Sequence, residues 1–291
     1  MKKLLPVFFT ATVFTFFSCE KEYSLENSAN TSGNGIIIGT DCRISKIAYN
    51  DTSAAGTGIG ALTANINSSD VVTSITKFDS LSLTIEFFAT ATYAGDTVHI
   101  NADEYFLADA ATKRIRQLHA LSDPTDPSSL QYEVNYFYDG AGYLVNKFYT
   151  LTSNPGVPFY IVRYTYTGGK LTYMRGNEQV AGADGDLITD ADVSYFNNIL
   201  PKNFLYIFPD EESYPYFNQF YNFGNKPSNA VKDIAVRYYD PGNVLRDSTV
   251  SSFSNYMMSR DNYVLSVIMN GDDQLSIPAS AGKLSFSYKC K

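Results

Sequence analysis

The sequence predicts an all-β fold, a large antiparallel meander of long hairpins that is either open or rolled into a barrel-like sheet. Tyrosine and phenylalanine supply all of the 15% aromatic content, and aromatic residues favour the pleated, half-buried surface of strands. Between Tyr132 and Tyr138, large apolar residues alternate with polar ones at a period of two. Turn centres near Asp109, Asp139 and Gly168 recur about 30 residues apart, which suits two strands of about ten residues with two connections.

The residues before position 41 have the composition of an export signal and a tether. Lys2 and Lys3 lead into an apolar run from Leu4 to Phe17, which is the layout of a signal peptide. At about 14 residues, that run is too short to cross a bilayer as a permanent helix. We expect a signal peptide over residues 1–18, a flexible tether rich in Ser, Asn, Thr and Gly over 19–40, and a single β domain over 41–291.

The residues from Phe16 to Cys19 resemble the lipobox of bacterial lipoproteins. The resemblance implies cleavage before Cys19, lipid attached to Cys19, and the membrane as a partner through this lipid. Glu20, Lys21 and Glu22 resemble the acidic export tag of surface lipoproteins of Bacteroidota-type bacteria, although a solvated tether predicts the same residues. The localisation implied is an outer-membrane lipoprotein on the cell surface or the periplasmic face. An ordinary secretory signal with a chance cysteine is the alternative.

Two cysteines remain after Cys19: Cys42 at the start of the first predicted strand, and Cys290 beside the last residue. In an oxidising compartment, two such thiols most simply form a disulfide with each other. Disulfide geometry would then make the first and last strands neighbours, which favours a sheet rolled toward closure. A reactive thiol or a metal ligand is the alternative role for these cysteines.

Glycine-rich turns between alternating runs, as at Asp139 to Gly142, are a strong hairpin signal. The unit from Tyr136 to Leu144, which reads Tyr-x-Tyr-Asp-x-x-Gly-x-Leu, resembles the units of YD-repeat proteins. The closing residues Ser287 to Cys290 resemble the Ser-Tyr-x-Cys end of Bacteroidota-type lipoproteins of unknown function. These resemblances imply a large antiparallel sheet over residues 41–291, of the kind sometimes called porin-like.

Residues 190–223 interrupt the hairpins, and we expect a short helical insertion here. A helix over Asp190 to Leu200 would be capped by Asp190 or Asp192 and ended by Pro201. The following segment, 206–223, is dense in aromatic residues and is expected to plug or cover one end of the sheet. It also supplies the candidate ligand-binding residues, because large rings with polar tips suit the recognition of sugars and proteins. These candidates are Tyr206, Tyr214, Tyr216, Phe217, Phe220 and Tyr221.

Net charge, histidine content and the absence of common motifs exclude several classes of function. The formal net charge is −8 at pH 7 and becomes more negative once Lys2 and Lys3 are removed, which argues against nucleic acid or anionic lipid headgroups as partners. His99 and His119 lie in strand-like runs, and we interpret both as surface or packed strand residues rather than acid–base groups. The sequence carries none of the common nucleophile, zinc or phosphate-loop motifs, so no cofactor is expected apart from Ca²⁺.

Clustered carboxylates suggest two further chemistries. Asp184, Asp186 and Asp190 are candidate Ca²⁺ ligands, although a plain acidic turn is the simpler interpretation of these residues. A carboxylate-dependent glycan hydrolase is the second possibility, because the fold rather than sequence spacing pairs the acids of such enzymes. Its candidate acids are Asp210, Glu211 and Glu212, for which a solvated charge cluster is the simpler interpretation.

The function these features favour is a non-enzymatic, membrane-anchored lipoprotein that binds a glycan or another envelope protein through aromatic side chains. The glycan hydrolase and a purely structural envelope protein are the alternatives. A barrel embedded in the membrane is disfavoured, because the alternating runs carry Lys147 and Arg163 and charged side chains facing lipid are costly.

Overall fold

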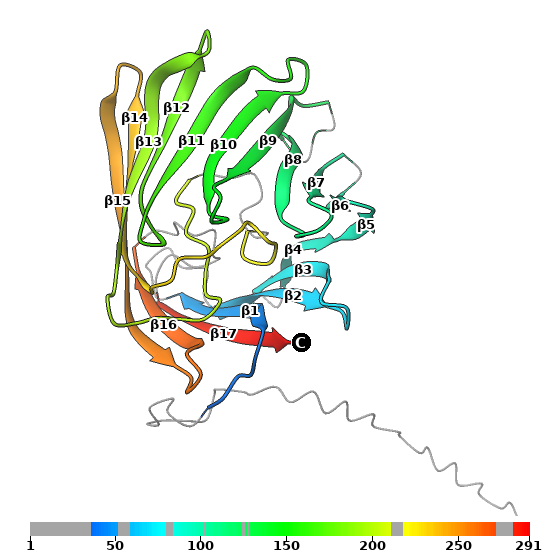
Figure 1. Cartoon of the computed structure of the whole chain (residues 1–291), viewed down its shortest axis with the longest axis vertical. Coiled ribbons are helices and arrows are strands. Elements are labelled where there is room, and N and C mark those ends of the chain that lie inside the picture. The colour runs from blue at the N-terminus through cyan, green and yellow to red at the C-terminus, as the bar shows by residue number, and fades with distance from the viewer. Residues whose placement is uncertain are drawn as a thin grey trace, which may run out of the picture. The chain divides into compact units, whose positions relative to one another are not determined.

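The computed structural model describes residues 36–51, 59–79, 84–101, 103–123, 126, 128–210, 218–271 and 282–291. These residues form one antiparallel sheet in which strands that follow one another in the chain lie side by side (Figure 1). The predicted all-β antiparallel meander is therefore confirmed. The strands are β1 (Cys42–Asp51), β2 (Ile59–Ile66), β3 (Val72–Asp79), β4 (Thr84–Thr90), β5 (Thr92–Ala94), β6 (Thr97–His99), β7 (Tyr105–Ala108), β8 (Ile115–Leu121), β9 (Gln131–Tyr138), β10 (Leu144–Leu151), β11 (Pro158–Thr167), β12 (Lys170–Val180), β13 (Ala183–Tyr195), β14 (Val231–Asp240), β15 (Val244–Met258), β16 (Val264–Asn270) and β17 (Gly282–Cys290).

The sheet is rolled into a nearly closed barrel, because β1 pairs with β2 on one edge and with β17 on the other. Only Ala91 separates β4 from β5. β4 pairs with β3 on one side, and β5 pairs with β6 on the other. Together, β4 and β5 therefore act as one bent strand of the sheet. Merging them leaves an even number of alternating strands. An even number is required for the first and last strands of a closed meander to run antiparallel, as β1 and β17 do.

A disulfide fastens the seam where the first and last strands meet. Cys42 and Cys290 lie opposite each other at the end of the β1–β17 ladder and are bonded, which confirms the expected pairing. The chain enters the barrel at the same end. There the backbone N–H groups of Ile38 and Gly39 donate to the carboxylate of Asp261, at 3.2 and 2.8 Å to the nearer oxygen, in the turn between β15 and β16.

The inner face of the barrel is largely apolar, whereas the outer face mixes polar side chains with exposed apolar ones such as Phe88, Phe137 and Val250. In β9, Tyr132, Val134 and Tyr136 are buried, whereas Glu133 and Asn135 on the opposite face are only half-buried. Alternating side chains along a strand point to opposite faces, so each strand contributes one row to the core and one to the surface. The period-two pattern of the sequence therefore separates the barrel's interior from its exterior.

The YD-like unit forms a hairpin turn whose residues have distinct roles. The carboxylate of Asp139 accepts a hydrogen bond from the N–H of Tyr143 at 2.8 Å, and Gly142 has a φ of +91°, a conformation that glycine adopts without strain. Tyr136 and Leu144 on either side of the turn are buried in the core. The spacing of the motif thus follows from one turn and its two inward-facing neighbours.

Residues 196–230, which connect β13 to β14 and are described except for 211–217, form a segment that we call the plug. Figure 1 shows it in yellow within the curve of the sheet. Phe204 to Phe208 are all buried. Phe208 packs on Tyr164 of β11 with ring centroids 5.6 Å apart, and Phe204 packs on Phe286 of β17 at 5.1 Å. The described aromatic residues of the plug therefore pack against the barrel wall, in keeping with the expectation that this segment plugs or covers one end of the sheet.

The expected helix over Asp190 to Leu200 is wrong, because Asp190 to Tyr195 complete strand β13. Ala191 is buried and Asp192 is exposed, which is the alternation of a strand. The carboxylate of Asp190 accepts a hydrogen bond from Arg237 Nε on β14 at 2.6 Å instead of capping a helix. This charge pair across neighbouring strands outweighs the local capping signal. Within the described ranges no residue is helical, and no helix there is long and apolar enough to cross a membrane.

Candidate functional site

The plug is hydrogen-bonded to successive turns at one rim of the barrel, which we call the plugged rim. Three polar residues of its returning half each reach a different turn, namely those that follow β7, β9 and β11. Because these turns lie about 30 residues apart in sequence, the repeat that predicts the hairpins also spaces the attachment points of the plug. The contacts are Asn222 Nδ2 to Thr112 O at 2.9 Å, Asn225 N to Gly142 O at 2.8 Å, and Ser228 N to Gly169 O at 3.4 Å.

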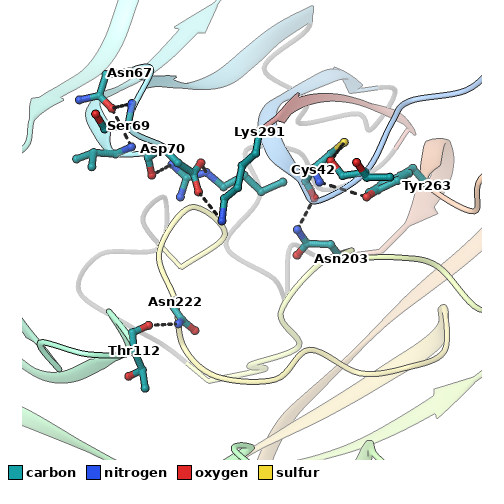
Figure 2. Close-up of polar contacts among 12 residues, drawn as sticks. Cys42, Asn67, Ser69, Asp70, Thr112, Asn203, Asn222, Tyr263 and Lys291 are labelled. Carbon is teal, nitrogen blue, oxygen red and sulfur yellow. Dashed lines mark hydrogen bonds and ion pairs between the residues drawn. The ribbon is translucent and has the colours of Figure 1, made fainter.

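The first half of the plug is held on the opposite side of the same rim. The amide of Asn203 donates to the carbonyl of Cys42, and the N–H of Lys202 donates to Asn262 O at 2.8 Å in the turn between β15 and β16. Figure 2 shows Asn203 and Asn222 on the plug pointing toward Cys42 and Thr112. The plug therefore spans the rim and is attached at both sides.

A buried ion pair attaches the plug to the barrel wall. Lys147 Nζ of β10 lies 3.0 Å from Asp210 Oδ2, and Tyr164 OH of β11 donates to Asp210 Oδ1 at 2.6 Å. Burial lowers the pKa of Lys147, and the Asp210 carboxylate offsets part of that shift. Burial also raises the pKa of Tyr164 well above its usual range, so the phenol stays protonated and donates. These groups hold the plug in place from inside the core.

Beside the plug, the plugged rim contains a pocket of about 480 Å³, a size that suits a small ligand such as one or two sugar units. Two cations, amide side chains and aromatic rings line it. The lining includes Arg43, Asn203, Tyr206, Tyr221, Asn225 and Lys226.

The lysine of this pocket is held in an unusual environment. Lys226 Nζ donates to the carbonyl of Phe204 and lies 4.8 Å from the centre of the Tyr206 ring. Burial lowers the pKa of Lys226 to about 7, and the positive charge of Arg43 adds to this shift. A small environmental change, such as an anion entering the pocket, therefore shifts the charge of Lys226 near neutral pH.

The predicted ligand-binding residues divide into two groups. Tyr206, Phe220 and Tyr221 line the pocket, whereas Tyr214, Tyr216 and Phe217 lie outside the described residues. The Tyr206 hydroxyl accepts a hydrogen bond from Phe223 N at 3.0 Å and donates to Gly224 O at 3.1 Å. Its polar tip thus stabilises the returning half of the plug, while its ring forms part of the pocket wall.

Sequence reasoning based on aromatic density missed the two cations and the amides. Arg43 is in β1 and Lys226 is in the plug, so only closure of the barrel places them in one pocket. The asparagine-rich run from Asn218 to Asn229 was an available signal. Asparagine side chains both cap turns and bind ligands, so the run alone does not distinguish the two roles.

The three candidate calcium ligands have separate partners. Asp184 accepts hydrogen bonds from Arg163 and Gln179, both at 2.7 Å, and Asp186 accepts one from the N–H of Gly242 at 3.0 Å. Asp190 is paired with Arg237, as described above. Within the described ranges, no group of three histidine, cysteine or acidic side chains is placed to hold a metal ion.

Among the acids and histidines considered for catalysis, those that the structure describes are absent from the pocket lining. Asp210 is buried in the ion pair with Lys147, and Glu211 and Glu212 lie outside the described residues. His99 and His119 are register partners of Tyr105 in neighbouring strands, and the His119 ring stacks on Tyr105 at 4.8 Å. These histidines are packed strand residues, which matches their interpretation from sequence.

The fold and the pocket together define a plugged antiparallel barrel with a ligand-sized pocket at one rim. Two solved structures share the fold. A porin-like protein from Bacteroides uniformis aligns with a TM-score of 0.56 and 10% identity, over 84% of this chain and 98% of that one. A porin-like protein from Bacteroides vulgatus aligns with a TM-score of 0.50 and 15% identity, over 86% of this chain and 99% of that one. No family model and no curated protein sequence matches the chain.

Proposed function

We propose that this chain is a membrane-anchored lipoprotein of the bacterial envelope and that its plugged barrel is a non-enzymatic module that binds a glycan. The observation that carries the proposal is the pocket at the plugged rim, which combines amide groups with aromatic rings. The likeness to porin-like proteins of Bacteroides is compatible with an envelope location.

The chemistry of the pocket suits a sugar. The Asn203 and Asn225 amides each donate through Nδ2 to a backbone carbonyl, of Cys42 and Ala141 respectively. An amide group has two donor hydrogens and an acceptor oxygen, so each retains hydrogen-bonding capacity for hydroxyl groups. The half-buried ring of Tyr221 offers apolar surface to the C–H face of a sugar ring. Polar groups at the edge of an aromatic wall are typical of sites that orient small polar ligands.

The outer surface of the barrel supports attachment by lipid rather than by immersion in the bilayer. Arg175, Asp192 and Lys232 are exposed on neighbouring strands of the barrel wall. Charged side chains facing lipid cost roughly 2–4 kcal/mol each at the bilayer midplane, depending on the residue. The lipid predicted on Cys19 supplies an attachment that leaves these charged side chains in water.

Mass spectrometry of the chain purified from membranes tests the attachment. We expect a mature chain that starts at Cys19 and carries acyl chains, and we expect a Cys19→Ser chain to leave the membrane fraction. A mature chain without acyl groups at Cys19 would contradict the anchor.

A glycan array probed with the full-length Cys19→Ser chain tests the binding function. We expect retention of a limited set of glycans, and weaker retention after Asn225→Ala, because this change removes a pocket amide. Absence of retention on every glycan would refute the proposed function.

A further inference from the structure

The rim pocket concentrates positive charge in an acidic chain. The formal net charge of the whole chain is −8, yet Arg43 and Lys226 both line this one pocket. Among the described residues that line it, none is acidic. A site with this charge attracts ligands of the opposite sign, and the attraction grows as the site is shielded from water.

The carboxylate that pairs with Arg43 in the described part of the chain is also shared with a lysine. Asp70, in the turn between β2 and β3, lies 2.9 Å from Arg43 Nε and 3.6 Å from Lys291 Nζ. Figure 2 shows Lys291 reaching Asp70 beside the plug. Two cations therefore share this single acid, and Lys226 adds a third positive group at the same rim.

Placing Lys226 in this pocket is unfavourable for the folded protein itself. Its ammonium is partly buried against the Tyr206 ring, and the positive charge of Arg43, which lines the same pocket, also lowers its pKa. A buried charge is normally stabilised by an opposite charge. An anionic group between Arg43 and Lys226 would provide that stabilisation and would restore the full charge of the lysine.

We infer that the rim pocket recognises an acidic sugar, whose carboxylate or phosphate group binds between Arg43 and Lys226 while its hydroxyl groups meet the amides of Asn203 and Asn225. This inference rests on the proposed glycan-binding function and names the chemical class of the ligand. Arginine offers a planar fork of donors that matches both carboxylate and phosphate oxygens, and lysine supplies a second point charge.

The place where the chain enters the barrel bears on the source of the ligand. Arg260 N donates to Ile36 O at 2.8 Å, so the chain enters beside the β15–β16 turn at the plugged rim, where the pocket also lies. An acidic sugar in solution and the phosphorylated sugar of a membrane glycolipid carry the same chemical group. The experiment separates these two sources.

The test is isothermal titration calorimetry of the full-length Cys19→Ser chain with a panel of uronic-acid and phosphorylated sugars, each paired with its neutral parent. We expect at least one acidic member to bind about tenfold or more tightly than its parent, since charge-assisted hydrogen bonds add that much. Lys226→Met should remove this preference. Lys289→Met, which removes an exposed lysine outside the pocket, should retain it.

A second variant is expected to change the affinity for the acidic sugar in the opposite direction. Asp70→Asn removes the carboxylate that competes for Arg43, so it should tighten binding of the acidic sugar several-fold, by roughly the worth of one charge contact. General damage to the fold would weaken binding, so a gain in affinity separates charge recognition from an unfolding effect. Unchanged or weaker binding in a folded Asp70→Asn chain would count against the placement of the anion beside Arg43.

The remaining outcomes distinguish the two proposals. Equal affinity for acidic and neutral members, unaffected by Lys226→Met, would overturn the acidic-sugar inference and leave glycan binding standing. Absence of binding to every member would overturn both. Co-sedimentation with phosphatidylcholine vesicles that contain lipid A, but not with plain vesicles, would assign the ligand to a membrane glycolipid. Binding to the free acidic sugars alone would assign it to a soluble source.

Discussion

The Lys147 ammonium lies 3.0 Å from the Asp210 carboxylate, and their side chains are 0% and 1% exposed. The pair joins the wall strand β10 to the plug, so it couples two parts of the chain that are distant in sequence. Removing one partner of such a pair leaves an unpaired buried charge, which costs far more than removing both partners together.

Asp210→Asn should therefore lower the free energy of unfolding by about 3–5 kcal/mol. The double variant Lys147→Met with Asp210→Leu should recover most of this loss, because no buried charge remains. Urea denaturation followed by tyrosine fluorescence measures both changes. Asp184→Asn is the matched control: its pair with Arg163 is more than a third exposed, so the change should be below about 1 kcal/mol.

The disulfide should contribute to stability without being needed for the fold. Replacing Cys42 and Cys290 together by alanine removes the bond but keeps the β1–β17 ladder. We expect a loss of about 2–5 kcal/mol in the free energy of unfolding, because the unfolded chain has more conformational entropy without the cross-link. Denaturation of the oxidised and reduced chains, compared with the variant, checks this. Equal stability of oxidised and reduced protein would contradict it.

Gly224 should tolerate no side chain, because the plug turns back against the wall at this residue. Its φ is +89°, and an added Cβ would collide with the carbonyl oxygen of Gly142. Gly224→Ala should destabilise the protein by roughly 1–3 kcal/mol through backbone strain and displacement of the plug. Gly140→Ala is the control, since nothing lies within 4 Å of a Cβ there. Similar thermal melting of the two variants would argue against close packing of the plug.

Lys226 should make stability depend on pH. Its pKa is about 7 in the folded chain against an ordinary value of 10.5, so between these values the unfolded chain binds a proton that the folded chain lacks. Stability should therefore rise as pH increases through this window, and the destabilising effect should be complete below about pH 7. The groups facing Lys226 are the Tyr206 ring, the Phe204 carbonyl and the positively charged Arg43.

Lys226→Met should remove that rise and stabilise the ligand-free protein by roughly 1–3 kcal/mol at pH 6. Urea midpoints measured at several pH values between 6 and 10 check the difference between the two chains. A parallel pH dependence in wild type and variant would show that the ammonium is solvated in the folded chain.

The fold was predictable because its signals are local. The hairpins were predictable from the alternation along β9 and from the turn residue Asp139, because both signals extend over only a few residues. The seam was predictable from the positions of the two cysteines near the ends of the domain. The helix expected at Asp190 failed because its carboxylate pairs with Arg237, which lies one strand away in space and far away in sequence.

The pocket was only partly predictable for the same reason. Tyr206 and Tyr221 belong to an aromatic segment that is visible in the sequence. Arg43 and Lys226 carry no shared motif, and they meet only after the barrel closes and the plug returns across its rim. Local patterns thus identify the wall and the plug, whereas the charge of the site depends on contacts between distant residues.

Hydrogen–deuterium exchange with and without a glycan that the chain binds tests the central claim most directly, namely that ligands bind at the plugged rim. We expect slower exchange in residues 218–228 and in the turn 139–143, both of which contribute to the pocket. Slower exchange confined to the outer face of β11–β15, with no change at the rim, would contradict the assignment of this pocket as the binding site.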